Sequence, residues 1–334
     1  MLKPKFFIGP MSKNIVDAII EFANKTKTPI GLIPSRRQVE RNGGYVNNWT
    51  TKEFCEYVRS KTKHVLLVRD HAGPNQGNDF DFGVTSFIQD CDENMFDVIH
   101  VDVWKQFKVY EEGLEATIDF INLGYTLNEN MRYEIGTEES IRPTTPEELD
   151  KLITDLKAIL PKRLFNKIEY VVIQSGTALQ GNENVGSFNQ DRLIEMVKVV
   201  DKHGLISKEH NGDYLSDELV IEKFKNGLDS INIAPEFGQI ETKLILQDIK
   251  ENHPEHFNLL YDICLASNRW VKWVSKDFNP DENKDELINI CGHYVLSNPQ
   301  FIKIKKKLSS DLDEKIKTAV KERLDRLVKA TTNE

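Results

Sequence analysis

The sequence predicts an α/β fold, a (β/α)8 TIM barrel with a C-terminal α-helical appendage. Short β-rich runs alternate eight times with helical patterns, and this alternation stops near residue 252. A barrel of this kind takes about 250 residues, which leaves room for an extension in a chain of 334 residues. We therefore expect the barrel over residues 1–252 and the helical extension over residues 253–334.

The eight expected strands have the composition of buried parallel strands. They are rich in β-branched and aliphatic residues, and Gly, Pro, Asn or Asp bounds them. Several are apolar on both faces, as strands covered by helices require. The expected strands are residues 4–9, 29–34, 64–70, 97–103, 132–137, 169–175, 204–210 and 229–234.

The segments between the strands show helical periodicity and helix start signals. Thr50 with Glu53, and Thr145 with Glu148, have the spacing of capping boxes. The expected helices are residues 13–25, 51–61, 80–93, 111–123, 146–160, 189–202, 216–227 and 237–251. The alternative α/β fold is an open sheet of the flavodoxin or Rossmann type. No G-x-G-x-x-G pattern follows the first expected strand, so the closed barrel is favoured.

The extension has the pattern of packed helices. Residues 307–330 form one long charged segment in which apolar residues recur with a period near 3.6, which predicts a helix with one packed face. The apolar positions are Leu308, Leu312, Ile316, Val320, Leu324 and Leu327. We expect this face to pack on the barrel or on a partner subunit, in a homo-oligomer or a hetero-oligomer.

Composition and charge exclude several classes of function. The net charge is -9, so the chain lacks the basic surface that nucleic-acid binding needs. No apolar run approaches the roughly 18 residues of a membrane span, and the N-terminus has no signal-peptide pattern. The four cysteines form no C-x-x-C pair. We expect a cytoplasmic protein with reduced thiols that binds neither nucleic acid nor membrane.

Polar residues gather where the expected strands end. In a barrel the carboxyl ends of the strands meet on one rim, and the loops there carry the catalytic groups. Buried ionisable groups are costly unless they are paired or bind a metal, so their convergence predicts a site. The residues at these ends are Asp70, His71, Asn75, Asp102, Glu134, Glu138, Gln174, Lys208, His210, Gly212, Asp213 and Asn232.

The chemistry of this set suits a divalent metal. His71, His210 and Glu134 offer the nitrogen and oxygen ligands of a zinc-like ion with an open coordination position. Asp70, next to a ligand, would act as the general acid and base on a metal-polarised carbonyl substrate. Glu138 is a second catalytic candidate.

Some of these residues also have simpler structural explanations. Lys208 would neutralise Glu134, His100 would be a hydrogen-bonded core histidine, and Glu138 would be a loop charge. A further alternative uses Lys208 as a Schiff-base amine without metal.

Five segments resemble, in this order, those of a known family. They are Gln38 to Tyr45, Asp70 to Asn75 (D-H-A-G-P-N), Ile99 to Asp102 (I-H-V-D), Ile135 to Glu138 (I-G-T-E) and His210 to Tyr214 (H-N-G-D-Y). The family is the non-catalytic, or Z, subunit of class II tagatose-bisphosphate aldolase, which is related to the zinc-dependent class II ketose-bisphosphate aldolases. The similarity runs nearly end to end.

The resemblance implies a TIM barrel of carbohydrate metabolism with aldehyde-lyase chemistry and a divalent metal, zinc above all. In the metal-dependent aldolases the position of Asp70 is the proton-transfer acid, and the positions of His71 and His210 are zinc ligands. Glu134 matches a glutamate that can approach the metal, and Asn232 matches a substrate-binding asparagine.

The sequence departs from the metal-dependent aldolases in the ligand set and in the phosphate loop. Gln174 stands where they have the remaining zinc histidine, as it does in the Z subunits, and an amide is a weaker ligand. The phosphate loop reads His210-Asn211-Gly212-Asp213, and Ala234-Pro235 follows Asn232 without hydroxyl groups. An acidic Asp213 disfavours the usual mode of phosphate binding.

Arg36 and Arg37 follow the second expected strand on the same rim. Guanidinium groups suit a phosphate or a carboxylate, so we infer an anionic sugar substrate held from this side of the barrel. The alternative is a solvated pair at a helix start.

The sequence thus supports three functions. The first is a metal-dependent aldolase that makes or breaks a carbon-carbon bond in a phosphorylated or acidic sugar, which the retained Asp70, His71 and His210 favour. The second is a non-catalytic subunit that stabilises a separate tagatose-bisphosphate-type aldolase, which Gln174 favours. The third is the Schiff-base lyase that uses Lys208. We lean to the first.

Overall fold

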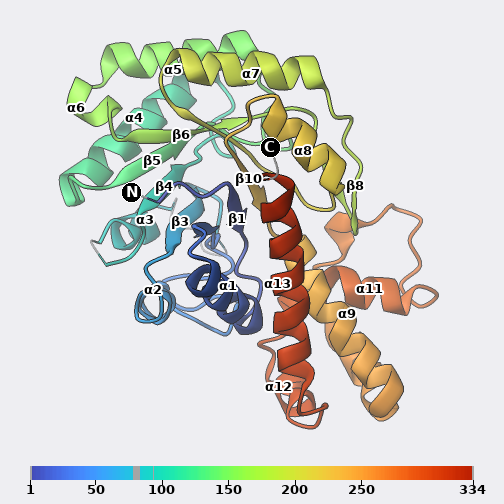
Figure 1. Ribbon diagram of the computed structural model, residues 1–334. Coiled ribbons are helices and arrows are strands. Elements are labelled where there is room, and N and C mark those ends of the chain that lie inside the picture. The colour runs from blue at the N-terminus through green and yellow to red at the C-terminus, as the bar shows by residue number, and fades with distance from the viewer. Residues whose placement is uncertain (1, 78–82, 93, 333–334) are drawn as a thin grey trace.

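The protein is a closed barrel of parallel strands with helices around it and a helical C-terminal extension (Figure 1). The computed structural model describes residues 2–77, 83–92 and 94–332. The barrel strands are β1 (Phe6–Ile8), β2 (Ile30–Leu32), β3 (Val65–Ala72), β4 (Val98–Val101), β5 (Arg132–Ile135), β6 (Ile168–Ile173), β9 (Ile206–Glu209) and β10 (Ser230–Ile233). They pair in the order β1-β10-β9-β6-β5-β4-β3-β2. The predicted TIM barrel is therefore confirmed.

The helices expected between the strands are present, with ends that differ by a few residues. They are α1 (Lys13–Thr26), α2 (Thr51–Arg59), α3 (Val84–Asp90), α4 (Tyr110–Leu127), α5 (Pro146–Ile159), α7 (Gln190–Lys202), α8 (Asp217–Lys225) and α9 (Pro235–Asn252). Both predicted capping boxes form, at Thr50 with Glu53 and at Thr145 with Glu148. Residues 80–82 and 93 of the expected third helix lie outside the described residues.

Two short elements between α5 and α7 were not predicted. Helix α6 (Lys162–Phe165) precedes β6. An antiparallel hairpin of β7 (Leu179–Gln180) and β8 (Glu183–Asn184) follows β6. Segments of two to four residues are too short to show a periodic pattern. The hairpin matters for the site, because the Asn184 amide donates to the backbone carbonyls of Asn211 and Asp213 in the loop after β9.

The barrel interior is layered along its axis. An apolar layer that includes Phe7, Val98 and Tyr170 fills part of it. Residues two apart on a strand share a face, so the His100 side chain points into the interior as that of Val98 does. Lys208 also lies in the interior, with its Nζ 3.9 Å from the Phe7 ring centroid. Charged side chains thus rest on the apolar layer within the barrel.

The C-terminal extension packs on the barrel of the same chain. Its elements are η1 (Pro254–His256), α10 (Phe257–Ala266), η2 (Val271–Trp273), α11 (Lys284–Cys291), η3 (Gly292–Tyr294), α12 (Pro299–Lys305) and α13 (Leu312–Ala330). Helix α13 packs against α1, α8 and α9 (Figure 1). Its predicted apolar face is buried, and Ile316, Val320 and Leu324 have no exposed surface.

The long terminal helix begins at Leu312 and not at residue 307. The carboxylate of Asp248 on α9 accepts a hydrogen bond from the backbone N–H of Ser309 at 3.0 Å and also contacts its hydroxyl. This anchor turns the chain before the helix starts. Leu308 therefore lies outside the helix but is still buried.

All four cysteines, Cys55, Cys91, Cys264 and Cys291, are buried and free of disulfide bonds. Within the described residues, every helix is too short or too polar to cross a membrane.

Candidate active site and metal centre

A break in strand β3 brings Asp70 and His71 to the same side. Neighbours on a regular strand point to opposite faces, yet both residues line one cavity. The pairing of β3 with β4 shifts register between Arg69 and Ala72, and His71 has a left-handed backbone with φ of 47°. Bulges re-aim side chains beside active sites, and such a conformation costs about 1–3 kcal/mol for a non-glycine residue. The strained backbone therefore lies at His71, directly after Asp70.

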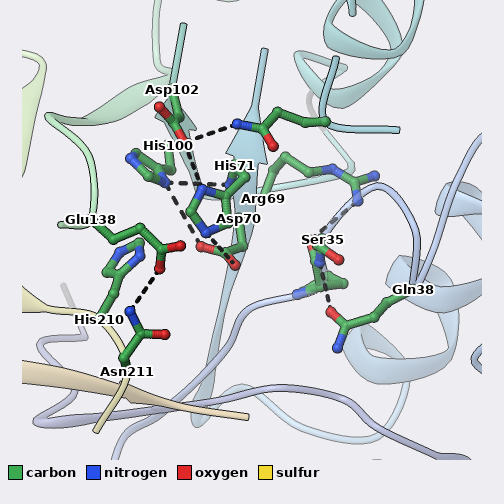
Figure 2. A network of polar contacts seen from close by, with 12 residues as sticks. Ser35, Gln38, Arg69, Asp70, His71, His100, Asp102, Glu138, His210 and Asn211 are labelled. Atoms are coloured by element: carbon green, nitrogen blue, oxygen red, sulfur yellow. Dashed lines mark hydrogen bonds and ion pairs between the residues drawn. The ribbon is translucent and has the colours of Figure 1, made fainter. Parts of the chain in front are cut away.

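Three histidines surround the Asp70 carboxylate at the end of the barrel (Figure 2). One ligand atom from each of Asp70, His71, His100 and His210 lies within 4.8 Å of those of the other three. The rings pack closely, with centroid distances of 5.1 Å for His71 and His100 and 5.0 Å for His100 and His210. Imidazole nitrogens and a carboxylate oxygen at this spacing are a donor set for a zinc-like divalent ion.

Each of the three rings has one nitrogen hydrogen-bonded away from the cluster. The contacts are His71 Nδ1 with Asp102 Oδ2 at 2.7 Å, His210 Nε2 with Glu134 Oε1 at 2.8 Å, and His100 Nε2 with the Gly136 carbonyl at 3.0 Å. Metal-binding histidines commonly donate their other N–H to a carboxylate or carbonyl, which fixes the tautomer. Here the same pattern leaves His71 Nε2 and His210 Nδ1 to face the cluster, whereas His100 Nδ1 accepts a hydrogen bond from the His71 backbone N–H at 3.3 Å.

Electrostatics hold Asp70 and His71 as an ionic pair. His71 Nε2 lies 3.6 Å from Asp70 Oδ2. Burial raises the pKa of Asp70, but the neighbouring His71 and His100 outweigh it and hold that pKa well below its usual range. Burial likewise disfavours a charged His71, but Asp70 and Asp102 raise its pKa to about 10. Asp70 is thus an ionised carboxylate within the cluster.

Glu134 and Lys208 form a buried ion pair behind His210. Lys208 Nζ donates to Glu134 Oε2 at 2.6 Å, and neither side chain is exposed. The Lys208 charge overcomes burial and holds the pKa of Glu134 well below its usual range. Glu134 therefore positions His210 and does not belong to the ligand cluster. Lys208 neutralises Glu134 and is fully buried, so the structure gives a carbonyl substrate no access to its amine.

Gln174 lies outside the cluster, in contrast to its expected place among the ligands. Its amide oxygen accepts from the Thr144 N–H at 2.9 Å and from Arg192 at 3.1 Å. Its NH2 group donates to the carbonyls of Thr137 and Arg142. Both the oxygen and the NH2 group of this amide are therefore hydrogen-bonded, to the loop after β5 and to α7. His100 stands in the cluster instead, as a hydrogen-bonded core histidine that also faces Asp70.

A cavity of about 320 Å³ opens above the histidines, which is enough for a small ligand. Most of the predicted site residues border it or stand directly behind its lining. Those that line it are Arg37, Asp70, His71, Glu138, His210, Asp213 and Asn232. Glu138 accepts from the Asn211 amide at 2.9 Å (Figure 2). Asp102 and Gly212 lie behind the lining, where the Gly212 N–H donates to the Asn232 carbonyl.

Arg36 and Asn75 do not line the cavity. Arg36 is buried against Glu40 and Ser86, with its Nε 2.8 Å from the Glu40 carboxylate. Only Arg37 of the predicted arginine pair reaches the cavity, because adjacent side chains diverge. Asn75 is exposed and contacts Gln106.

Several lining residues were not predicted at all. Lys105 follows β4, and Arg269, Lys272, Trp273 and Tyr294 come from the extension. No local pattern in the sequence indicates that the extension reaches the mouth of the barrel, because the contact joins segments that are far apart in the chain.

The fold and the cluster define a TIM-barrel protein with a candidate metal site at the carboxyl ends of its strands. Known proteins provide the comparison. No family model matches the chain, and no curated protein matches it in sequence. Solved structures match it at low identity over nearly its whole length, which establishes the shared fold.

Three of these structures come from sugar metabolism. A probable tagatose 6-phosphate kinase from Sinorhizobium meliloti has a TM-score of 0.73 at 16% identity, covering 98% of this chain and 100% of the other. A fructose-bisphosphate aldolase from Campylobacter jejuni has a TM-score of 0.58 at 15% identity, covering 97% and 90%. A fructuronate-tagaturonate epimerase from Cohnella laeviribosi has a TM-score of 0.59 at 12% identity, covering 99% and 79%.

The contact of Asp102 with His71 gives a testable prediction. Asp102→Asn should lower the affinity for a divalent ion about 10- to 100-fold, because His71 loses the carboxylate that orients its ring. Competition with a coloured chelator measures this affinity. Asp119→Asn, at an exposed position of α4, is the matched control. An affinity within twofold of the wild type for Asp102→Asn would contradict the prediction.

Proposed function

We propose that the chain is a divalent-metal-dependent lyase of the aldolase type that acts on an anionic sugar. The convergence of three oriented histidines on Asp70 carries this proposal. Asp70 Oδ1 is buried and has no hydrogen-bond partner in the described part of the chain. A buried ionised oxygen without a donor is costly, and a cation or a proton of the substrate would satisfy it.

The donor set fits a metal ion. In this proposal His71 and His210 hold it. His100 takes the place expected for Gln174 by exchanging the hydrogen bond that its Nδ1 accepts from the His71 backbone N–H for the ion, while Glu134 supports His210 from behind. A divalent ion bound there would polarise a carbonyl group of the substrate.

Asp70 is the proposed proton carrier. Its ionised carboxylate lines the cavity beside the histidines, where it would take a proton next to the substrate carbonyl and return it. Asn232 Oδ1 is buried without a hydrogen-bond partner among the described residues, and it faces the same cavity. It would accept a hydrogen bond from a sugar hydroxyl. Glu138 is placed to do the same or to assist the proton transfer.

The comparisons agree with an anionic sugar as substrate. The similar aldolase is named for a sugar bisphosphate, and the similar epimerase is named for two sugar acids. The cavity carries Arg37 and further cations to which such groups would bind.

The second candidate is a non-catalytic subunit of a separate aldolase. Gln174 favours it, because contacts within the protein occupy the amide and keep it from serving as a metal ligand. The extension, however, was the expected contact surface of such a subunit. Here it packs on its own barrel and contributes side chains to the cavity. This arrangement favours the enzyme.

Metal content decides between these two functions. Protein purified without chelator should hold close to one zinc, cobalt or manganese ion per chain, measured by elemental mass spectrometry. The His71→Ala/His210→Ala variant should lose that metal. His253→Ala/His256→Ala, which removes two histidines outside the cluster, should keep it. A wild type that stays free of metal with excess divalent ions present would reject the enzyme proposal.

A further inference from the structure

One end of the cavity is strongly basic. Arg37 follows β2, Lys105 follows β4, and Arg269 and Lys272 come from the extension, yet all four line the same cavity. Two distant parts of the chain therefore place cations at one spot. Lys272, at the mouth, is the most exposed of them.

None of these four cations forms an ion pair with a described residue. The ion pairs found within the described ranges involve other basic residues, as in the pairs of Arg142 and Arg192. Arg37 Nε is buried without a hydrogen-bond partner there, and Lys105 donates only to the neutral Asn75 carbonyl. Partial burial and the charges of Arg37 and Arg269 lower the pKa of Lys272 to about 8, against the attraction of Glu138.

The opposite end of the cavity is closed to an anion. In barrels of this fold, the loops after the seventh and eighth strands and a helix N-terminus often bind phosphate. Here those strands are β9 and β10, and Asp213 occupies the position. Its Oδ1 accepts from the N–H groups of Ala234 and Glu236, each at 2.8 Å, at the start of α9.

Negative charge is disfavoured at this acidic end. Asp213 is almost fully buried, and burial together with the charge of Glu236 raises its pKa to about 8. The Glu236 carboxylate is itself held there by the Tyr214 N–H and by Arg323. An anionic group of a ligand would lie beside these two acids. The backbone N–H groups that would bind it already donate to Asp213.

We propose that the substrate binds with its acidic group between Arg37 and Lys105 of the barrel and Arg269 and Lys272 of the extension, and that its other end is neutral. The ligand is thus a sugar with one acidic group and not a bisphosphate. The extension completes the active site of its own barrel. This inference rests on the proposed function only in taking the ligand to be a sugar that reaches the histidines.

Anion binding to the whole chain tests the proposal without any need for turnover. Inorganic phosphate and D-gluconate are the probes, and equilibrium titration by nuclear magnetic resonance measures the dissociation constants. Arg269→Ala/Lys272→Ala should weaken binding about tenfold or more, because charge-assisted hydrogen bonds are lost. Arg269→Lys/Lys272→Arg should stay close to the wild type. Lys303→Ala/Lys306→Ala is the matched control, since it removes two exposed lysines of the extension far from the cavity.

The outcomes separate this proposal from the proposed function. Loss of binding in the alanine variant alone supports the basic end, and the probe that binds more tightly distinguishes a phosphate ester from a carboxylate. Wild-type affinity in that variant, or no saturable binding of either probe to the wild type, would overturn it. Metal content is measured on the same samples, so a metal-free chain that binds the probe would reject only the enzyme proposal.

Discussion

Asp70→Asn should lower turnover about 10²- to 10⁴-fold, the range expected when a general acid or base is lost. Asparagine keeps the size of the side chain but cannot carry the proton. The three histidines remain, so metal content should change little. The measurement is the rate of cleavage of an acidic sugar, together with deuterium uptake next to its carbonyl group.

Two controls make the Asp70 result specific. Asp119→Asn, at the exposed position of α4, should leave turnover unchanged. Glu138→Gln removes another acid that lines the cavity and tests whether it carries the proton instead. Turnover of Asp70→Asn within threefold of the wild type would assign the proton transfer elsewhere. Loss of metal in step with loss of turnover would make Asp70 a ligand rather than the base.

The barrel was predictable because its signals are local. Each strand is a short apolar run bounded by turn residues, and the capping boxes at Thr50 and Thr145 mark helix starts within four residues. The β7–β8 hairpin was not predictable, because two-residue strands have no period. The start of α13 also escaped prediction, since it depends on the contact of Ser309 with Asp248, residues that are distant in the sequence.

The candidate site was predictable only where strand ends identify it. Asp70, His71 and His210 come at such ends. Lys208 is two residues before His210, so the two side chains share a face of the strand, and both contact Glu134. Parity could not show that a bulge turns both Asp70 and His71 inward.

Contacts between distant segments account for what the sequence did not reveal about the site. Gln174 ends its strand like a ligand, but Thr144 and Arg192 take its amide oxygen. Arg269 and Lys272 enter the cavity from the extension, and nothing in their local sequence points to a barrel.

Asp90→Ala should destabilise the protein by about 3–5 kcal/mol, the cost of leaving a buried charge without its partner. Arg69 is fully buried, and its Nε and Nη2 each lie 2.8 Å from an Asp90 oxygen. The same guanidinium donates to the carbonyls of Pro34 and Val39, so it ties β3 to the loop after β2. Urea unfolding followed by tryptophan fluorescence measures the change. Asp119→Ala should change stability by no more than about 0.5 kcal/mol, and a loss below about 1 kcal/mol for Asp90→Ala would contradict the prediction.

The Arg69–Asp90 pair also tests how the strained backbone at His71 is held. Buried ion pairs often contribute little net stability compared with apolar residues of similar volume. Arg69→Met/Asp90→Leu should therefore be more stable than Asp90→Ala. A pair that only stabilised the barrel would leave turnover unchanged in a double variant that folds stably. If the double variant folds but turns over substrate more slowly than the wild type, the pair also serves to place Asp70 and His71.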